Sequence, residues 1–193
     1  DPVLFNVLEG QVFSLKKKRN IGLQLMLSIM GQQLSTKVAA VFKQRFLALF
    51  PTQKVPVMTD VLAISYEQLR SIGLSHAKAT YVHAVAAFFE THQLTDRQLH
   101  ALNNDELKAL LTQIKGVGPW TVEMLLMFSM ARTDVFPVDD LGIRQAMLQL
   151  YGIRSKDLRR QKARMQAIAT LWHPYQTYAC MHLWHWKDNA PKL

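Results

Sequence analysis

The sequence predicts an all-α fold, and three observations support this prediction. Apolar residues recur at helical spacing along most of the 193 residues. Polar residues of the kinds that cap helices stand directly before several of these segments. Alternating strand patterns bounded by hairpin turns are missing from the sequence. About ten short helices joined by short loops fit this length and pattern.

The first half of the chain contains three strongly periodic segments. Residues 21–30 are apolar but short and interrupted by polar residues, which predicts a buried helix and not a membrane span. Ser75 is expected to cap a helix that runs to about His92. The segment 36–50 is expected to be a helix whose apolar stripe comprises Val38, Ala39, Val41, Phe42, Phe46, Leu49 and Phe50.

The second half continues the helical pattern. Asn104 is expected to cap a helix over 105–114, with acidic residues in the first turn where the helix dipole favours them. Pro119 stands where a first-turn proline is tolerated and opens the next helix. Three more helices are expected over 139–150, 155–172 and 174–187.

Composition limits the function classes. The single cysteine, Cys180, excludes an internal disulfide and a four-cysteine zinc or iron–sulfur site, and it favours a reducing compartment. No small-residue cleavage site follows the basic run at 16–19, so no signal peptide is predicted, although a start at Asp1 leaves room for preceding residues. A formal charge of +9 favours an anionic partner such as nucleic acid.

A candidate anion site lies between two of the predicted helices. The amphipathic segment 107–114 ends at Lys115-Gly116-Val117-Gly118, and a new helix starts at the next residue. Glycines allow a tight turn and leave backbone N–H groups uncovered at a helix N-terminus, where a DNA phosphate can bind without any base being read. A bare Gly-x-Gly is also typical of an ordinary connection between helices, so the neighbouring motifs decide.

Those motifs resemble one family. The run Gly-Val-Gly-Pro-Trp-Thr at 116–121 is followed by Phe-Pro-Val-Asp-Asp at 136–140. Further matches are Gly-Gln-Gln-Leu-Ser-Thr-Lys at 31–37, Gly-Leu-Ser-x-x-Lys at 73–78, Trp-x-Pro-Tyr at 172–175 and His-Leu-Trp at 182–184. In this order they resemble the helix-hairpin-helix DNA glycosylases with a Gly/Pro-rich loop and a catalytic aspartate, and within them the 3-methyladenine DNA glycosylase II branch.

The resemblance implies a two-lobed helical fold with the base-binding cleft between the lobes and no N-terminal β domain. Residues 1–35 and 134–193 would form one lobe, and residues 36–133 the other, with the helix-hairpin-helix at about 105–131. No cofactor is expected to be required. In this family the hairpin binds a structural Na⁺ or K⁺, which here implies the backbone carbonyls of Thr112, Ile114 and Val117.

The implied function is base excision repair of alkylation damage. The enzyme would hydrolyse the glycosidic bond of 3-methyladenine or 7-methylguanine flipped from duplex DNA and leave an abasic site. Trp120, Trp184 and Met124 match the positions that line the base pocket, and aromatic faces suit a cationic base. Bifunctional relatives carry a lysine nucleophile at position 120, so Trp120 predicts no lyase activity.

The catalytic carboxylate is one of two neighbours. The resemblance implies Asp140, because this branch shows a twenty-residue offset between the catalytic aspartate and the position of Trp120, while relatives with a single aspartate after Pro-Val would indicate Asp139. The catalytic carboxylate stabilises the positive sugar or activates water. If Asp140 is catalytic, Asp139 would be the helix N-cap or a supporting carboxylate.

The resemblance also implies the DNA contacts. Gln33 by register, or Leu34 beside it, would fill the stack vacated by the base. His173 and Gln176 depart from the family, which often has arginines there. The remaining predicted contacts are Gln32, Ser35, Lys115, Gly116, Val117, Gly118 and Thr121.

Two other functions stay open at this point. One is an oxidised-purine or mismatch glycosylase on the same scaffold, and the other is a non-catalytic module that binds the DNA backbone through the hairpin. The aspartate pair favours an enzyme, because such a module has no need of it. The expected partner is duplex DNA containing a damaged base, with no membrane association and a monomeric protein. The expected location is the cytoplasm and nucleoid of a prokaryote or the nucleus of a eukaryote.

Overall fold

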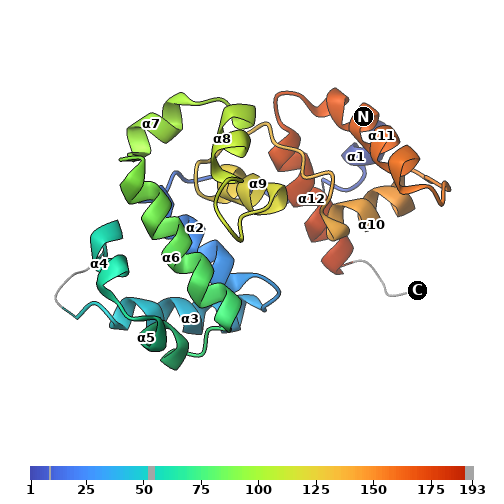
Figure 1. The fold of residues 1–193 in the computed structure, drawn as a ribbon. Coiled ribbons are helices and arrows are strands. Elements are labelled where there is room, and N and C mark those ends of the chain that lie inside the picture. The colour runs from blue at the N-terminus through green and yellow to red at the C-terminus, as the bar shows by residue number, and fades with distance from the viewer. Residues whose placement is uncertain (9, 52–54, 190–193) are drawn as a thin grey trace. The chain divides into compact units, whose positions relative to one another are not determined.

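The structure is a computed structural model, and it describes residues 1–8, 10–51 and 55–189 (Figure 1). The regular elements in these residues are all helices, which confirms the predicted all-α class. In chain order they are α1 (Pro2–Phe5), α2 (Ile21–Gly31), α3 (Thr36–Ala48), α4 (Met58–Ala63), α5 (Tyr66–Ser71), α6 (His76–Thr91), α7 (Asp96–Ala101), α8 (Asn104–Leu111), α9 (Pro119–Phe128), α10 (Leu141–Leu150), α11 (Leu158–Ala169), the 3-10 helix η1 (Thr170–Trp172) and α12 (Gln176–Asn189).

The chain divides into two compact units. Residues 17–125 form the central unit, and residues up to 16 together with those from 126 onward form the terminal unit. The resemblance had assigned residues 17–35 to the terminal lobe and 126–133 to the central one. The structure groups α2 with the central unit because α2 packs against α3 and α6.

The core of the central unit surrounds α6. Its buried residues recur at intervals of three and four, and Ser75 caps its first turn by accepting a hydrogen bond from the Lys78 N–H at 3.3 Å. Helices α2, α4 and α5 pack against it. A Cβ added at Gly22 of α2 would lie 2.8 Å from the Met58 Cε and 2.9 Å from the Phe89 ring, so glycine permits the close approach of α2.

Two predicted helices of this unit differ in detail. Helix α3 ends at Ala48, and Val38 and Val41 remain 42% and 44% exposed, so the predicted stripe is only partly buried. Helix α8 is capped by Asn103 and not by Asn104, because the side-chain oxygen Oδ1 of Asn103 accepts hydrogen bonds from the Asp105 and Glu106 N–H groups.

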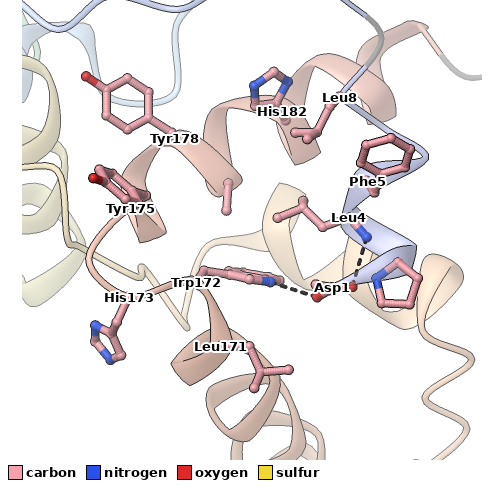
Figure 2. Close-up of a pocket in the computed structure, with 12 residues that line it drawn as sticks. Asp1, Leu4, Phe5, Leu8, Leu171, Trp172, His173, Tyr175, Tyr178 and His182 are labelled. Atoms are coloured by element: carbon pink, nitrogen blue, oxygen red, sulfur yellow. Dashed lines mark hydrogen bonds between the residues drawn. The ribbon is translucent and has the colours of Figure 1, made fainter.

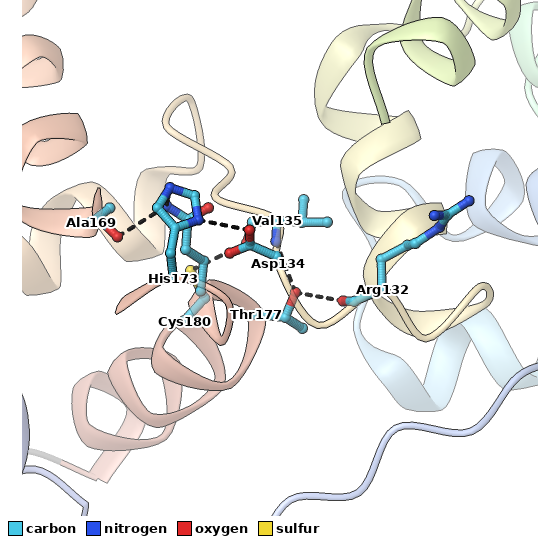
Figure 3. A network of polar contacts seen from close by, with 8 residues as sticks. Arg132, Asp134, Val135, Ala169, His173, Thr177 and Cys180 are labelled. Atoms are coloured by element: carbon cyan, nitrogen blue, oxygen red, sulfur yellow. Dashed lines mark hydrogen bonds and ion pairs between the residues drawn. The ribbon is translucent and has the colours of Figure 1, made fainter. Parts of the chain in front are cut away.

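The terminal unit is built on the packing of α10 against α11 and α12. Thr177 of α12 fixes the chain that leads toward the aspartate pair (Figure 3). Its hydroxyl donates to the Arg132 carbonyl at 2.7 Å and accepts from the Val135 N–H at 3.2 Å. Beside it, the His173 Nδ1 lies 2.7 Å from the Asp134 carboxylate.

Asp1 is bound into the same unit. Its carboxylate caps α1 and accepts a hydrogen bond from the Trp172 indole at 2.8 Å (Figure 2). It also accepts one from the Tyr151 hydroxyl at 2.7 Å. A cavity of about 660 Å³ lies between α1 and the segment 171–182, with lining side chains that are mostly aromatic and aliphatic. None of the predicted pocket, catalytic or DNA-binding residues lines this cavity.

Candidate active site and DNA-binding hairpin

The predicted hairpin is present in the central unit. Helix α8 ends at Leu111, a turn follows, and α9 begins at Pro119 as expected. The Lys108 ammonium of α8 lies 2.9 Å from the carboxylate of Glu123 in α9, and Glu123 is only 5% exposed. This partly buried ion pair, for which the sequence carries no motif, ties the two helices together.

Glycine is present at the two hairpin positions for different structural reasons. Gly116 has φ +90°, and a Cβ there would lie 2.2 Å from the Tyr81 ring, so the fold itself requires glycine. A Cβ at Gly118 would meet nothing within 4 Å. Gly118 therefore leaves open space in front of the first turn of α9, where backbone N–H groups can receive an anion.

The backbone carbonyls implied for a monovalent cation lie in the same turn. Ile114 and Val117 have buried side chains, which fixes the turn, and the Val117 N–H donates to the Ile114 carbonyl at 3.0 Å. A carbonyl oxygen has a second lone pair, so this bond is compatible with a cation on the other side. Among the described residues, no group of three or more His, Cys, Asp or Glu side chains could hold a metal. The cation site implied for the backbone carbonyls of Thr112, Ile114 and Val117 stays a prediction.

The predicted wedge residues form an exposed tip after α2. Gln33 is exposed, and Leu34 is 37% exposed. Gln32 is half-buried, and its amide donates to the Thr121 hydroxyl at 2.9 Å. Ser35 accepts a hydrogen bond from the Val38 N–H and so caps α3. Only Gln33 and Leu34 of this segment are thus both exposed and free of a capping role.

Thr121, which was predicted to contact DNA, has a buried side chain. Its side chain is 3% exposed and holds Gln32. Any DNA contact at this position would have to use the backbone, because the buried hydroxyl is already engaged inside the protein. Lys115, by contrast, is exposed on the turn.

Aromatic and sulfur-containing side chains follow one another along α9 at intervals of four residues. Trp120 is 37% exposed and Met124 is half-buried, and their place in a base pocket stays a prediction. The series continues with Phe128, which is also 37% exposed and which the sequence analysis did not select. The Phe128 ring lies 5.9 Å from the Trp184 ring in the terminal unit, so Phe128 adds a second aromatic face there. The i, i+4 spacing was the signal that could have found it.

Asp140 is the centre of the candidate site in the terminal unit. It is the N-cap of α10 and is 9% exposed. One carboxylate oxygen, Oδ1, accepts hydrogen bonds from the Ile143 N–H at 2.8 Å and from the Trp184 indole N–H at 2.9 Å. Both donors and the helix N-terminus stabilise a negative charge and fix the plane of the carboxylate.

Gly142 permits this arrangement, although the sequence analysis did not name it. A Cβ at this position would lie 3.0 Å from the Trp184 ring and 3.1 Å from the Asp140 Oδ1. A larger residue would therefore push on the hydrogen bond between the indole and the carboxylate. The sequence contains no local signal for this, because Trp184 lies 44 residues beyond Asp140.

Asp139 occupies a different environment. Its side chain is 53% exposed, and its carboxylate forms an ion pair with Lys162 of α11. The prediction that Asp139 caps the helix is wrong, because the capping carboxylate is that of Asp140. Of the two roles expected for Asp139, the structure excludes the N-cap, and that of a supporting carboxylate stays a prediction. Asp140 has the buried, hydrogen-bonded position.

Comparison with known proteins identifies the family. Residues 26–174 match the model of the HhH-GPD superfamily of base excision DNA repair proteins. This match covers most of the chain, and the chain therefore belongs to the HhH-GPD superfamily.

Named relatives and solved structures support the same family. DNA-3-methyladenine glycosylase 1 of Schizosaccharomyces pombe is 32% identical over 83% of this chain and 70% of its own length. The Bacillus subtilis protein YfjP is 30% identical over 83% of this chain, which spans only 56% of YfjP. The structure of a DNA-3-methyladenine glycosidase from Bacillus halodurans has a TM-score of 0.82 at 32% identity, covering 98% of this chain and 86% of that one. The S. pombe enzyme in complex with abasic DNA has a TM-score of 0.83 at 28% identity, covering 98% and 92%.

Proposed function

We propose that the chain is a monofunctional DNA glycosylase that hydrolyses the N-glycosidic bond of alkylated purines and leaves an abasic site. The observation that carries this proposal is the buried Asp140 carboxylate, which is held by a helix N-terminus and by the Trp184 indole. A module that only bound the DNA backbone would need an N-cap at this position, but it would not need a charged one that is also held by an indole. Burying such a charge is costly, and the donors around it offset that cost.

The chemistry asks little more of the protein than two functions. A purine alkylated at N3 or N7 carries a positive charge, so its bond to the sugar is already weak. The aromatic faces of Trp120 and Trp184 are each suited to such a cation. Asp140 then stabilises the positive charge that develops on the sugar, or it activates the attacking water. Trp184 would serve twice, because its indole also orients the Asp140 carboxylate.

The reaction class follows from position 120. A lysine there would attack the sugar, form a Schiff base and permit strand cleavage. Trp120 has no nucleophilic atom for this reaction. The bond is therefore broken by water, and the product is an intact strand with an abasic site.

DNA would be bound through the hairpin. The open space at Gly118 and the exposed Lys115 suit a backbone phosphate, and they read no sequence. A Na⁺ or K⁺ held by the carbonyls of Thr112, Ile114 and Val117 would add positive charge beside that phosphate. We propose that the protein acts as a monomer on damaged duplex DNA in the compartment that holds the DNA. No helix in the described residues is long and apolar enough to cross a membrane.

The relatives support the choice of substrate. The S. pombe relative is named as a DNA-3-methyladenine glycosylase, and its solved complex contains abasic DNA, the product expected here. Because the chain spans little more than half of YfjP, the activity and substrate range of the whole protein remain part of the proposal.

The experiment that tests this function compares two kinds of damage. The protein is incubated with methylated duplex DNA and, separately, with duplex DNA containing 8-oxoguanine. We expect release of 3-methyladenine and 7-methylguanine and no release of 8-oxoguanine. Release of 8-oxoguanine alone would favour an oxidised-purine glycosylase, and DNA binding with no base release would favour a non-catalytic module.

A further inference from the structure

Lys78 of α6 has a function in the structure that none of the roles above includes. Its ammonium donates hydrogen bonds to two backbone carbonyls at the end of α2, those of Met30 and Gln32, both at 2.8 Å. The side chain is half-buried, and burial lowers the pKa of its ammonium. Carbonyls at a helix C-terminus lack intrahelical partners and carry partial negative charge, so a cation is well matched to them.

The carbonyls that Lys78 holds immediately precede the exposed tip. Gln33 follows with φ +59°, a left-handed conformation that a residue with a Cβ adopts only at a cost. The Leu34 N–H then donates to the Gly31 carbonyl at 3.1 Å and closes the turn. Such a strained residue persists where its surroundings over-determine the backbone. Here the surroundings are Lys78 on one side and the bond between Gln32 and Thr121 on the other.

Extrusion of a base requires unstacking, which costs free energy, and the vacated space must be filled. A side chain can fill it only if its backbone keeps its position. We infer that Lys78 is a positioning residue for base extrusion, holding the tip of Gln33 and Leu34 in the conformation that enters the DNA stack. This inference rests on the proposed glycosylase function.

A direct phosphate contact is the alternative role for a lysine in a DNA-binding protein. An ammonium has three N–H donors, and two of those on Lys78 are engaged inside the protein. The two roles differ in their salt dependence. Loss of a phosphate contact lowers the slope of log Kobs against log salt by about 0.9, whereas loss of a positioning residue leaves that slope unchanged.

The test compares Lys78→Met, which keeps the stem but removes the donors, with Lys78→Arg, which retains donors and charge. Lys43→Met, at an exposed lysine of α3, is the matched control. Release of methylated purines is measured from the same DNA as a duplex and as a single strand. We expect Lys78→Met to slow release from the duplex by about tenfold or more, the scale of a lost charge-assisted hydrogen bond. Release from the single strand should change much less, Lys78→Arg should recover part of the duplex rate, and Lys43→Met should have no effect.

Equal losses on duplex and single strand, or a reduced salt slope, would overturn the inference. A second readout does not depend on base release. A 2-aminopurine placed beside a non-cleavable abasic analogue should change its fluorescence when the tip of the unmutated protein enters the stack, and Lys78→Met should lose that change. If the unmutated protein releases no methylpurine, the proposed function fails, and the fluorescence result alone decides the role of Lys78. An unchanged fluorescence response in Lys78→Met would refute that role.

Discussion

Replacing Asp140 with asparagine separates the catalytic role of this residue from its structural one. Asparagine has the same shape and keeps an oxygen that can accept from the Ile143 N–H and the Trp184 indole. Asn and Asp are nearly equivalent N-caps, so we expect the free energy of unfolding to change by no more than about 0.5 kcal/mol. The negative charge, however, is lost.

The loss of this charge should have a large effect on the rate of base release. Two unit charges about 4 Å apart interact by about 4 kcal/mol at an effective dielectric constant of about 20. Removing the carboxylate charge near the developing sugar cation should therefore slow base release by about 100-fold to 1000-fold. Affinity for DNA should stay the same or rise slightly, because a negative charge is removed from a protein that binds a polyanion.

The assay combines single-turnover release of methylated purines with urea unfolding and a DNA-binding titration. Asp140→Ala is the structural comparison, since it removes the cap and leaves the Trp184 N–H without its acceptor. We expect Asp140→Ala to cost about 2–4 kcal/mol of stability. Asp139→Asn, at the exposed neighbour, should retain most of the activity. The reasoning is refuted if Asp140→Asn releases bases at nearly the unmutated rate, or if Asp139→Asn is the variant that loses activity.

Three further predictions concern the glycines of the hairpin, His182 and Trp184. Gly116→Ala should destabilise the protein by at least about 2 kcal/mol, because the alanine would combine a left-handed φ with a ring contact, whereas Gly118→Ala should leave urea unfolding unchanged and weaken DNA binding. Burial lowers the pKa of His182 below its ordinary value of 6.5, so the neutral ring favours the folded state. Stability should therefore fall as the pH drops from 6.5 through the lower folded pKa, and His182→Phe should reduce this acid-side loss of unfolding free energy. Trp184→Phe keeps an aromatic ring but removes the N–H that donates to Asp140. We expect a large loss of base release with unchanged DNA binding, which would show that the hydrogen bond to Asp140 contributes to activity in addition to the aromatic ring.

Much of the fold could be predicted because a long amphipathic helix has a local sequence pattern of apolar residues and capping residues. The α6 prediction was correct at both ends, since Ser75 caps the helix and His92 follows its last residue. The short helices α4, α5 and α7 have too few turns for a periodic pattern, and none of them was predicted. The capping error at α8 has a clear cause. Glu106 forms a capping box with the residue three positions before it, which is Asn103.

The exposed valines of α3 show what periodicity leaves undetermined. An apolar stripe predicts which face of a helix is suited to burial, but whether a neighbour covers it depends on the packing of distant segments. Val38 and Val41 lie on the predicted stripe and remain partly exposed. The boundary between the two units is also set by packing between distant segments. Helix α2 falls in the central unit because it packs against α6, which lies far along the chain.

The features of the candidate site also divide into those that are local in sequence and those that join distant segments. The glycines of the hairpin and the aspartate pair are contiguous motifs, and the sequence identified both. The hydrogen bond from Trp184 to Asp140, the contact of Gly142 with that indole and the clamp of Lys78 on the end of α2 all join segments far apart in sequence. The structure was needed to see that Asp140 is both the helix cap and the carboxylate buried against an indole.

One reaction on an end-labelled, methylated duplex tests whether this protein removes a damaged purine by hydrolysis and leaves the strand intact. Both products are followed, the free bases by chromatography and the strand on a denaturing gel before and after alkali. We expect free 3-methyladenine and 7-methylguanine together with a strand that breaks only after alkali treatment. Strand breaks before alkali, or no free methylated base at all, would refute the proposed function.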